Sequence, residues 1–450
     1  MTFEQSWTWR MPQNARPYQF VAILAALAGC TSTNAIDEAT HATALSTTES
    51  FDANTAVAPI TVPEELRHLL DAGLIKQDAL FDGRSALIEA TILRQAHGWS
   101  RFPEIVPNIS VDDVGNAQGQ LSANFTLFDW GKAGGEKQTL DARLLRARMD
   151  LWREHNEFSE ELLENLVKAA VAQSRGDLIA RHLSTNKGFQ ALVEDRVTAG
   201  VGEAAEIPLV ALRVQELIRD GAVERSQREV YLATLTQLSG LERSKLPAID
   251  LEALIKTVDR VPTITVPPSL QIARTDVLIS DGLIRTALAD RLPSVVLSGV
   301  AAVIGGSSSG LRLGLGNKSL TNAVAQTDTK IARAGAVVAM ARLQAEEDAL
   351  VQDNALFSLR QREINARIGA IATQIKVSQQ AVKTFDQQFK IGARPITDAV
   401  QVHERLYEGE RLLIEAKQEY AILLIQRLSK LGALYIQPNI AFGDPLYEQQ

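Results

Sequence analysis

Arginine and acidic side chains occur together at a turn near the C-terminus. The stretch 389–401 reads Phe-Lys-Ile-Gly-Ala-Arg-Pro-Ile-Thr-Asp-Ala-Val-Gln and contains Arg394 and Asp398. A guanidinium presents a planar fork of donors that matches a carboxylate. The chemistry that this stretch offers is therefore an ion pair, with Asp398 or the earlier Glu206 as the acid.

Glycine and proline in this stretch predict a helical hairpin. Gly392 suits a helix C-terminus, where a left-handed residue closes the last turn. Pro395 suits the first turn of the next helix, and Asp398 would lie near its N-terminus, where negative charge is favoured. A weaker copy occurs earlier, with Gly200 matching Gly392 and Glu206 matching Asp398. On the residues alone, both acids can also be ordinary first-turn residues.

The stretches that lead into and out of these turns have helical periodicity. From about 139 to 196 there is no proline, and charges surround an apolar stripe formed by Leu162, Leu163, Leu166, Val167, Ala170, Val171 and Leu178. A helix of about 55 residues would be ~80 Å long, which no compact domain accommodates. We therefore expect a coiled coil or a helical barrel. Further long helices are predicted up to about 241, over about 320–388, and up to Gly432.

Four shorter segments predict strands, at about 105–114, 121–128, 294–304 and 311–315. In 121–128, apolar and polar residues alternate with period two. About ten residues suit a membrane-crossing strand, but membrane barrels need at least about eight strands. Open edges in lipid would leave backbone groups unpaired, so a membrane location requires several chains, and three would supply about twelve strands. The alternative is a set of soluble hairpins that cap a coiled coil.

The order helix, strand, strand, long helix, hairpin, long helix occurs twice, which predicts an internal duplication. The predicted fold is mainly α with transmembrane β: a long coiled-coil helical barrel plus a β-barrel shared among three chains. We expect a signal peptide over 1–29, a lipidated flexible tether over 30–62, a first repeat over 63–245, a connector over 246–270, a second repeat over 271–436 and a C-terminal tail over 437–450.

The N-terminus has the pattern of an exported lipoprotein. The apolar run 20–29 is too short to span a bilayer and has the length of a signal-peptide core. It ends in Leu-Ala-Gly before Cys30, the only cysteine of the chain. This ending resembles the bacterial lipobox, in which the cysteine carries lipid such as palmitate. A buried apolar helix with an incidental cysteine is the alternative, and Met1 or Met11 could be the start.

Composition argues against several function classes. The net charge of -8 provides no basic surface for nucleic acid. Six histidines are scattered without metal-ligand spacing, and no nucleophile elbow occurs. We therefore expect no enzyme, no metal and no cofactor other than the covalent lipid. His97 and His403 are interpreted as surface or packing residues.

Two motifs resemble the TolC-type outer-membrane channel proteins. They are Leu-Phe-Asp-Trp-Gly-Lys at 127–132, after the second strand, and Ile-Gly-Ala-Arg-Pro-Ile-Thr-Asp at 391–398. The resemblance covers about 85–436. It implies a homotrimer with a β-barrel in the outer membrane and a helical tunnel across the periplasm. It also implies a periplasmic adaptor and an inner-membrane transporter as partners, so that the chain is a passive exit duct for small molecules or drugs.

The same resemblance assigns roles at the periplasmic gate. Asp398 matches an acidic ring at the constriction, and Arg394 matches an arginine that ties helices together when the pore is shut. Phe389 matches an aromatic position, often tyrosine, in that link, and Glu206 matches the acidic partner in the first hairpin. Gln401 stands where the family can carry a second aspartate, so the acidic ring is expected to be weaker here.

Several alternatives remain at the level of sequence. A channel of this type can instead serve type I secretion of proteins or peptides. A periplasmic coiled-coil scaffold or adaptor lipoprotein is the other rival, although adaptors usually carry a lipoyl-like all-β domain beside one helical hairpin. Thr31 rather than aspartate follows Cys30, which by resemblance to bacterial lipoproteins favours an outer-membrane location. Trp130 is either an anchor at a membrane interface or a packed corner residue.

Overall fold

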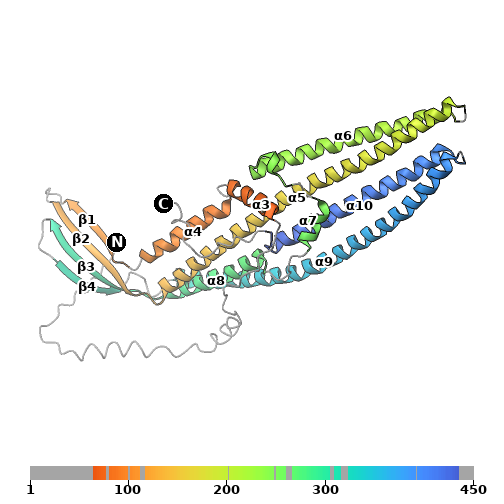
Figure 1. Ribbon diagram of the computed structural model, residues 1–450. Helices are drawn as coiled ribbons and strands as arrows, with labels where there is room; N and C mark the ends of the chain where they lie inside the picture. The colour runs from red at the N-terminus through yellow and green to blue at the C-terminus, as the bar shows by residue number, and fades with distance from the viewer. Residues whose placement is uncertain are drawn as a thin grey trace. The chain divides into compact units, whose positions relative to one another are not determined.

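The computed structural model describes residues 64–77, 81–99, 102–111, 117–200, 202–247, 250–259, 266–304, 309–315, 323–391 and 393–434. Cys30, Gly392, the signal peptide, the tether and the C-terminal tail lie outside these ranges. The elements, in order (Figure 1), are α3 (Glu64–Gln77), α4 (Asp82–Trp99), β1 (Glu104–Val111), β2 (Ala117–Phe128), α5 (Lys132–Thr198), α6 (Glu206–Ser239), η2 (Arg243–Lys245), α7 (Leu251–Val258), α8 (Pro268–Ala289), β3 (Val295–Ile304), β4 (Ser309–Leu315), α9 (Ala323–Lys390) and α10 (Ile396–Lys430).

The predicted order of elements is confirmed in both halves of the chain. Helix α5 has 67 residues and α9 has 68, and each is followed by a helix of 34 or 35 residues. The sequence placed the start of α5 too late, at about residue 139. The helix begins at Lys132 because the turn after β2 leads directly into it. The proline-rich connector also contains a helix that the sequence did not predict, α7.

The four strands form one antiparallel sheet in the order β1-β2-β3-β4. Their register places Glu104 opposite Asn124, Asn124 opposite Ser298, and Ser298 opposite Arg312. Because side chains alternate between the faces of a strand, these four residues share one face. The strands have 8, 12, 10 and 7 residues. Strand β1 therefore ends earlier than the predicted 105–114, whereas β4 begins earlier than the predicted 311–315.

The two faces of the sheet differ in polarity. The register assigns the following apolar residues and glycine to one face: Ile105, Pro107, Ile109, Leu121, Ala123, Phe125, Val295, Leu297, Gly299, Ala301, Leu311, Leu313 and Leu315. Leu311 is 75% exposed and Ile109 is 72% exposed. The opposite face is mostly polar and includes Gln120, Ser122, Asn124, Thr126 and Arg312. The alternation predicted for 121–128 is therefore confirmed, with its apolar side uncovered.

Asp129 organises the turn between the first hairpin of strands and α5. Its Oδ1 accepts the N–H of Gly131 at 3.0 Å and its Oδ2 accepts that of Ala133 at 2.7 Å. A carboxylate here satisfies donors at the helix N-terminus and is favoured by the helix dipole. Gly131 has a φ of 86°, which suits glycine.

Trp130 connects this turn to the second half of the chain. Its Nε1 donates to the carbonyl oxygen of Pro293 at 2.9 Å, immediately before β3. Its ring meets that of Phe128 edge to face, with 4.8 Å between centroids. These contacts place Trp130 at the corner between the strands and α5. Its side chain is 43% exposed, and both roles that the sequence allowed stay predictions.

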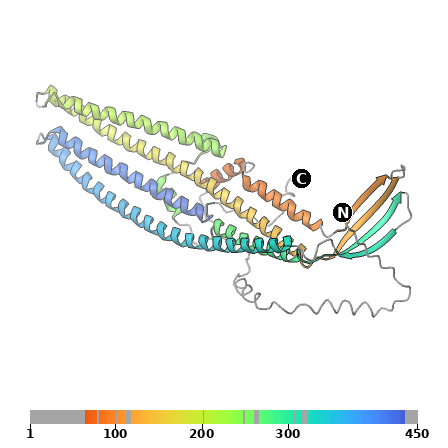
Figure 2. The ribbon, with the colours of Figure 1, turned by 180° about the vertical axis from the view of Figure 1, so that it is seen from behind.

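The helices pack against one another along their apolar stripes. Helix α5 contacts α4, α6, α8 and α10, and α9 contacts α8 and α10; both views show α8 beside α5 and α9 (Figures 1 and 2). The stripe predicted on α5 is buried throughout, with Leu162 and Val167 at 0% exposure. The stripe of α10 is buried too, at Ala421, Leu424, Leu428 and Leu431. None of the described helices is both long and apolar enough to cross a membrane.

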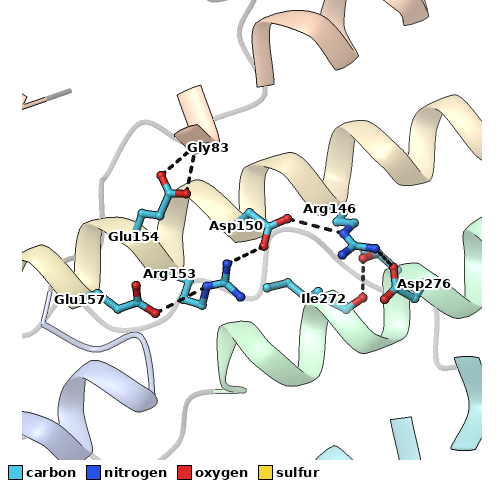
Figure 3. A network of polar contacts seen from close by, with 9 residues as sticks. Gly83, Arg146, Asp150, Arg153, Glu154, Glu157, Ile272 and Asp276 are labelled. Atoms are coloured by element: carbon cyan, nitrogen blue, oxygen red, sulfur yellow. Dashed lines mark hydrogen bonds and ion pairs between the residues drawn. The ribbon is translucent and has the colours of Figure 1, made fainter. Parts of the chain in front are cut away.

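A polar network fastens α4 and α8 to α5 (Figure 3). Glu154 of α5 accepts the N–H of Gly83 with both carboxylate oxygens, at 3.1 and 2.8 Å. Gly83 lies in the first turn of α4, where a negative charge is stabilising. On the other side of α5, Arg146 pairs with Asp276 of α8 and lies 3.6 Å from Asp150.

Helices α5 and α8 approach closely at two glycines. A Cβ on Gly282 would lie 2.9 Å from both the carbonyl oxygen of Gly135 and the N of Thr139. A Cβ on Gly135 would lie 2.9 Å from the carbonyl oxygen of Gly282. Any side chain at either position would force the backbones apart, so both residues are constrained to glycine by packing.

Gly282→Ala is expected to destabilise the protein, because the added methyl group meets backbone atoms that cannot rotate away. Overpacking of this kind costs about 1–3 kcal/mol. The matched control is Gly188→Ala on α5, where a Cβ would meet nothing within 4 Å and where alanine should add helix propensity. The measurement is the unfolding midpoint of each purified variant in detergent. A Gly282→Ala protein as stable as the control would contradict the close approach.

Candidate functional site

The first hinge joins α5 to α6 through a turn closed by backbone hydrogen bonds. Gly200 has a φ of 72° and donates its N–H to the carbonyl oxygen of Val197 at 3.0 Å. Gly202 donates to the carbonyl oxygen of Arg196 at 3.1 Å. The left-handed glycine predicted at position 200 is therefore present. Glu206 is the first residue of α6, as its first-turn interpretation requires.

The second hinge joins α9 to α10. Ala393 donates its N–H to the carbonyl oxygen of Gln388 at 2.9 Å, which closes the end of α9. Pro395 immediately precedes α10 with an extended ψ of 159°, so it lies one residue before the first turn in which the sequence placed it. Asp398 lies in that first turn as expected. Gly392 is outside the described residues.

An apolar core joins the two hinges. Phe389 is 1% exposed and meets Phe189 of α5 edge to face, with 6.1 Å between the ring centroids. The other buried members of this hinge core come from α5, α6 and α10, namely Val193, Val210, Ile396, Ala399 and Val400. Phe389 is thus a packing residue of the contact between the hairpins.

Arg394 makes its contacts within the second hairpin. Its Nη1 donates to Asp398 Oδ2 at 3.0 Å and its Nε to Gln388 Oε1 at 2.9 Å. Its guanidinium also lies over the ring of Phe385, 4.6 Å from the centroid. The side chains of Arg394 and Asp398 are 45% and 34% exposed, and such surface pairs contribute about 0–1 kcal/mol.

The structure brings together some of the predicted residues and keeps others apart. Arg394 and Asp398 form the ion pair that the sequence allowed, whereas Glu206 has a buried Oε2 with no hydrogen-bond partner. The aromatic ring beside Arg394 belongs to Phe385. Phe389, the aromatic residue that the resemblance placed in this link, instead faces Arg196.

Arg196 is a hinge residue that sequence reasoning missed. It lies in the last turn of α5, donates from Nη1 to the carbonyl oxygen of Phe389 at 2.9 Å, and has its guanidinium carbon 5.0 Å from the centre of that residue's ring. In a long helix rich in charged residues, an arginine does not stand out by its residue type. Only the position of Arg196 shortly before Gly200 could have indicated a role at the hinge.

Charged pairs connect the hairpins above the hinge core. Arg175 of α5 lies 3.7 Å from Glu224 of α6 and 3.3 Å from Glu415 of α10. Burial raises the pKa of the Glu224 carboxyl group, and Arg175 partly opposes this effect. His182 of α5 lies 2.8 Å from Glu410 of α10. These contacts hold the two hairpins beside one another along part of their length.

His403 packs within the hinge region, in agreement with its expected packing role. Its ring lies 4.9 Å from that of Phe189, and its Nε2 lies 3.0 Å from Asp386 Oδ1. In the part of the chain that the structure describes, no group of three or more His, Cys, Asp or Glu could hold a metal ion. The arrangement at the hinges is therefore one of packing, hydrogen bonds and ion pairs.

The chain has two long antiparallel hairpins attached to a four-stranded antiparallel sheet, a fold that it shares with solved outer-membrane channels. Solved structures similar to this chain include the outer-membrane protein VceC from Vibrio cholerae, with 15% identity, a TM-score of 0.69, and coverage of 82% of this chain and 96% of that one. The CmeC outer-membrane channel from Campylobacter jejuni has 12% identity and a TM-score of 0.67, with coverage of 83% of this chain and 87% of that one. The open state of the MtrE outer-membrane channel from Neisseria gonorrhoeae has 17% identity and a TM-score of 0.66, with coverage of 82% of this chain and 89% of that one.

These likenesses establish the fold of the chain. Each covers more than four-fifths of this chain. No family model and no curated protein matches the sequence.

Phe389→Ala is expected to loosen the contact between the hinges, because it empties the centre of the hinge core. Replacement of a buried phenylalanine by alanine lowers the free energy of unfolding by about 3–5 kcal/mol. Hydrogen exchange at the backbone amides of Val193 and Val400 should accelerate relative to the wild-type protein. Phe385→Ala is the matched control, since Phe385 lies outside that core. Unchanged exchange in Phe389→Ala would show that the two hinges are held by something else.

Proposed function

We propose that this chain is the outer-membrane channel of a tripartite export system, a passive duct through which small molecules leave the cell. The observation that carries the proposal is the four-stranded sheet with one uncovered apolar face. A soluble protein would cover such a surface. In a bilayer, the same face would contact lipid and the polar face would contact water.

The edges of the sheet support an assembly of several copies. Within the described residues, β1 and β4 each pair on one side only. Backbone groups left unpaired in lipid cost several kcal/mol each. Pairing β1 of one copy with β4 of the next removes these edges, and three copies give about twelve strands, enough for a barrel. We therefore propose a homotrimer.

The helices also carry apolar surface that a neighbouring copy would bury. On α6, Leu212 is 64% exposed and Val230 is 59% exposed. On α9, apolar side chains are exposed along much of the helix, at Ile331, Val337, Val338, Val351, Leu359 and Val377. In the proposed trimer these residues pack between copies, and the hairpins continue the barrel as a tube across the periplasm. At its end a periplasmic adaptor and an inner-membrane transporter would dock.

The hinges are the proposed gate of this tube. Three copies of Asp398 around one axis would concentrate negative potential and favour cations. Arg394 lies 3.0 Å from the Asp398 carboxylate and partly offsets its charge, and Glu206 would supply the acid of the first hinge. Phe389 anchors the gate through the hinge core. Gln401 carries no charge, which leaves one acidic group per copy at this turn of α10.

Small molecules or drugs are the proposed cargo, and protein or peptide secretion is the competing use of the same fold. Export through either kind of system draws its energy from the inner-membrane partner. A drug/proton antiporter encoded beside this gene would favour efflux, and an ABC exporter would favour secretion.

The opposite polarity of the two sheet faces predicts a labelling pattern. In protein reconstituted into liposomes, Ser122→Cys on the polar face should react with a membrane-impermeant thiol reagent, whereas Leu121→Cys on the apolar face should be protected. The wild-type chain is a suitable background because its only cysteine is Cys30, whose thiol would be blocked by the proposed lipid. The same preparations should form channels in planar bilayers. Equal labelling at both positions, or a soluble monomer without conductance, would refute the channel proposal.

We further propose that Cys30 carries the lipid that anchors the mature chain in the outer membrane. Cys30→Ser should abolish incorporation of radiolabelled palmitate and leave an unprocessed precursor of higher mass. A mutation of the neighbouring Thr31→Ala should leave both incorporation and processing intact. Palmitate found in the Cys30→Ser protein would exclude this residue as the modification site.

A further inference from the structure

Arg196 is the polar side chain that crosses from the first hinge to the end of the second long helix. Its Nη1 donates to the carbonyl oxygen of Phe389 at 2.9 Å. Its guanidinium carbon lies 5.0 Å from the centre of the Phe389 ring. A single arginine therefore binds both the backbone and the side chain of one residue on the opposite hairpin.

The acceptor in this contact is suited to a cation. Phe389 is the penultimate residue of α9, and carbonyl groups in the last turn of a helix lack partners within the helix. They also carry the negative end of the helix dipole. The Phe389 side chain is 1% exposed and the hydrogen bond is part-buried, so the bond is partly shielded from water. A charged donor makes a stronger hydrogen bond under these conditions.

The contact between Arg196 and Phe389 also carries a cost of desolvation. The Nε of Arg196 is buried and has no hydrogen-bond partner. A buried donor without a partner loses the free energy of its hydration. When the hairpins separate, Nε regains water while Nη1 loses the carbonyl oxygen. The two effects oppose one another, which suits a contact that must form and break repeatedly.

Arg394 does not make a contact of this kind. Its hydrogen bonds go to Gln388 and Asp398, and its ring contact is with Phe385, all on α9 or α10. It therefore shapes the second hinge internally. Arg196 instead joins the hinges to each other.

We propose that Arg196 is the tie between the two hinges of one chain, and that its release from the Phe389 carbonyl oxygen accompanies separation of the hairpins when the tube opens. This inference rests on the proposed channel function. It moves the main closing link within a chain from Arg394 to Arg196. Phe389 then takes part through its backbone carbonyl oxygen. This contact does not need the ring hydroxyl that a tyrosine at this position would supply.

The test measures the distance between the hinges and the conductance in the same variants. Spin labels are attached to Ala204→Cys and Ala393→Cys, two exposed sites on opposite hinges, in a chain that keeps Cys30, whose thiol is blocked by the proposed lipid. The labelled chains are diluted with unlabelled chains. Arg196→Met keeps the length of the side chain but removes its donors. We expect it to broaden the distance distribution toward longer values and to raise the conductance in planar bilayers severalfold.

Three comparison variants make the outcome specific. Arg196→Lys keeps a cationic donor and should give an intermediate distribution. Arg394→Ser should leave the distance between the hinges unchanged, as should Arg181→Met, which alters an exposed arginine on the same helix α5. A wild-type distribution in Arg196→Met, or an Arg196→Lys protein as broad as Arg196→Met, would overturn the tie. If the wild-type protein forms no channel, the channel proposal fails, while the distance measurement still tests the tie.

Discussion

Unpaired backbone groups at the edges of the four-stranded sheet are the constraint on which the rest of the structure depends. The described sheet ends at β1 and β4, and each of these strands presents N–H and C=O groups outward. Beside water those groups find partners, but beside lipid they do not. The largely apolar face of the sheet makes lipid the expected neighbour in the proposed channel. In the proposed assembly, pairing with further copies would satisfy the backbone groups at the edges, and the apolar face would contact lipid.

This constraint extends from the sheet to the helices. Helix α5 begins at Lys132, directly after the turn that follows β2, and Asp129 and Trp130 fix that turn to its N-terminus and to Pro293. In a ring of copies, the long helices are therefore arranged in a ring as well. In the proposed trimer, the exposed apolar residues of α6 and α9 would pack between neighbouring copies. The buried stripe of α5 and the Gly135–Gly282 contact serve the chain's own packing.

Local pattern predicted the elements, but not how side chains meet across the hairpins. Alternation in 121–128 identified a strand because its two faces differ in polarity. The buried stripe from Leu162 to Leu178 identified α5 because charges surround it. The start of α5 was placed too late, since Gly134 and Gly135 weaken the helical signal there. The small size of Gly135 instead serves the close contact with α8. Helix α7 was missed because prolines flank a segment of only 8 residues.

At the hinges too, the sequence predicted the local features but not the contact between the hairpins. The glycine turn at position 200 and the first-turn acids Glu206 and Asp398 follow from local preferences, so the sequence predicted them. The partner of Arg394 was left open between two acids, and the structure pairs it with Asp398, the acid on its own hairpin. Arg196 depends on a residue almost two hundred positions away, which no local pattern encodes.

The two hinges are related by repetition but are not equivalent. The second hinge is self-contained, because Arg394, Gln388 and Asp398 satisfy one another within one hairpin. The first hinge has a cation that reaches outward and an acid, Glu206, whose buried oxygen lacks a partner. Movement between the hairpins would therefore disturb the polar contacts of the first hinge and preserve those of the second. A gate built this way keeps the position of Asp398 fixed within its own hairpin while the distance between the hairpins changes.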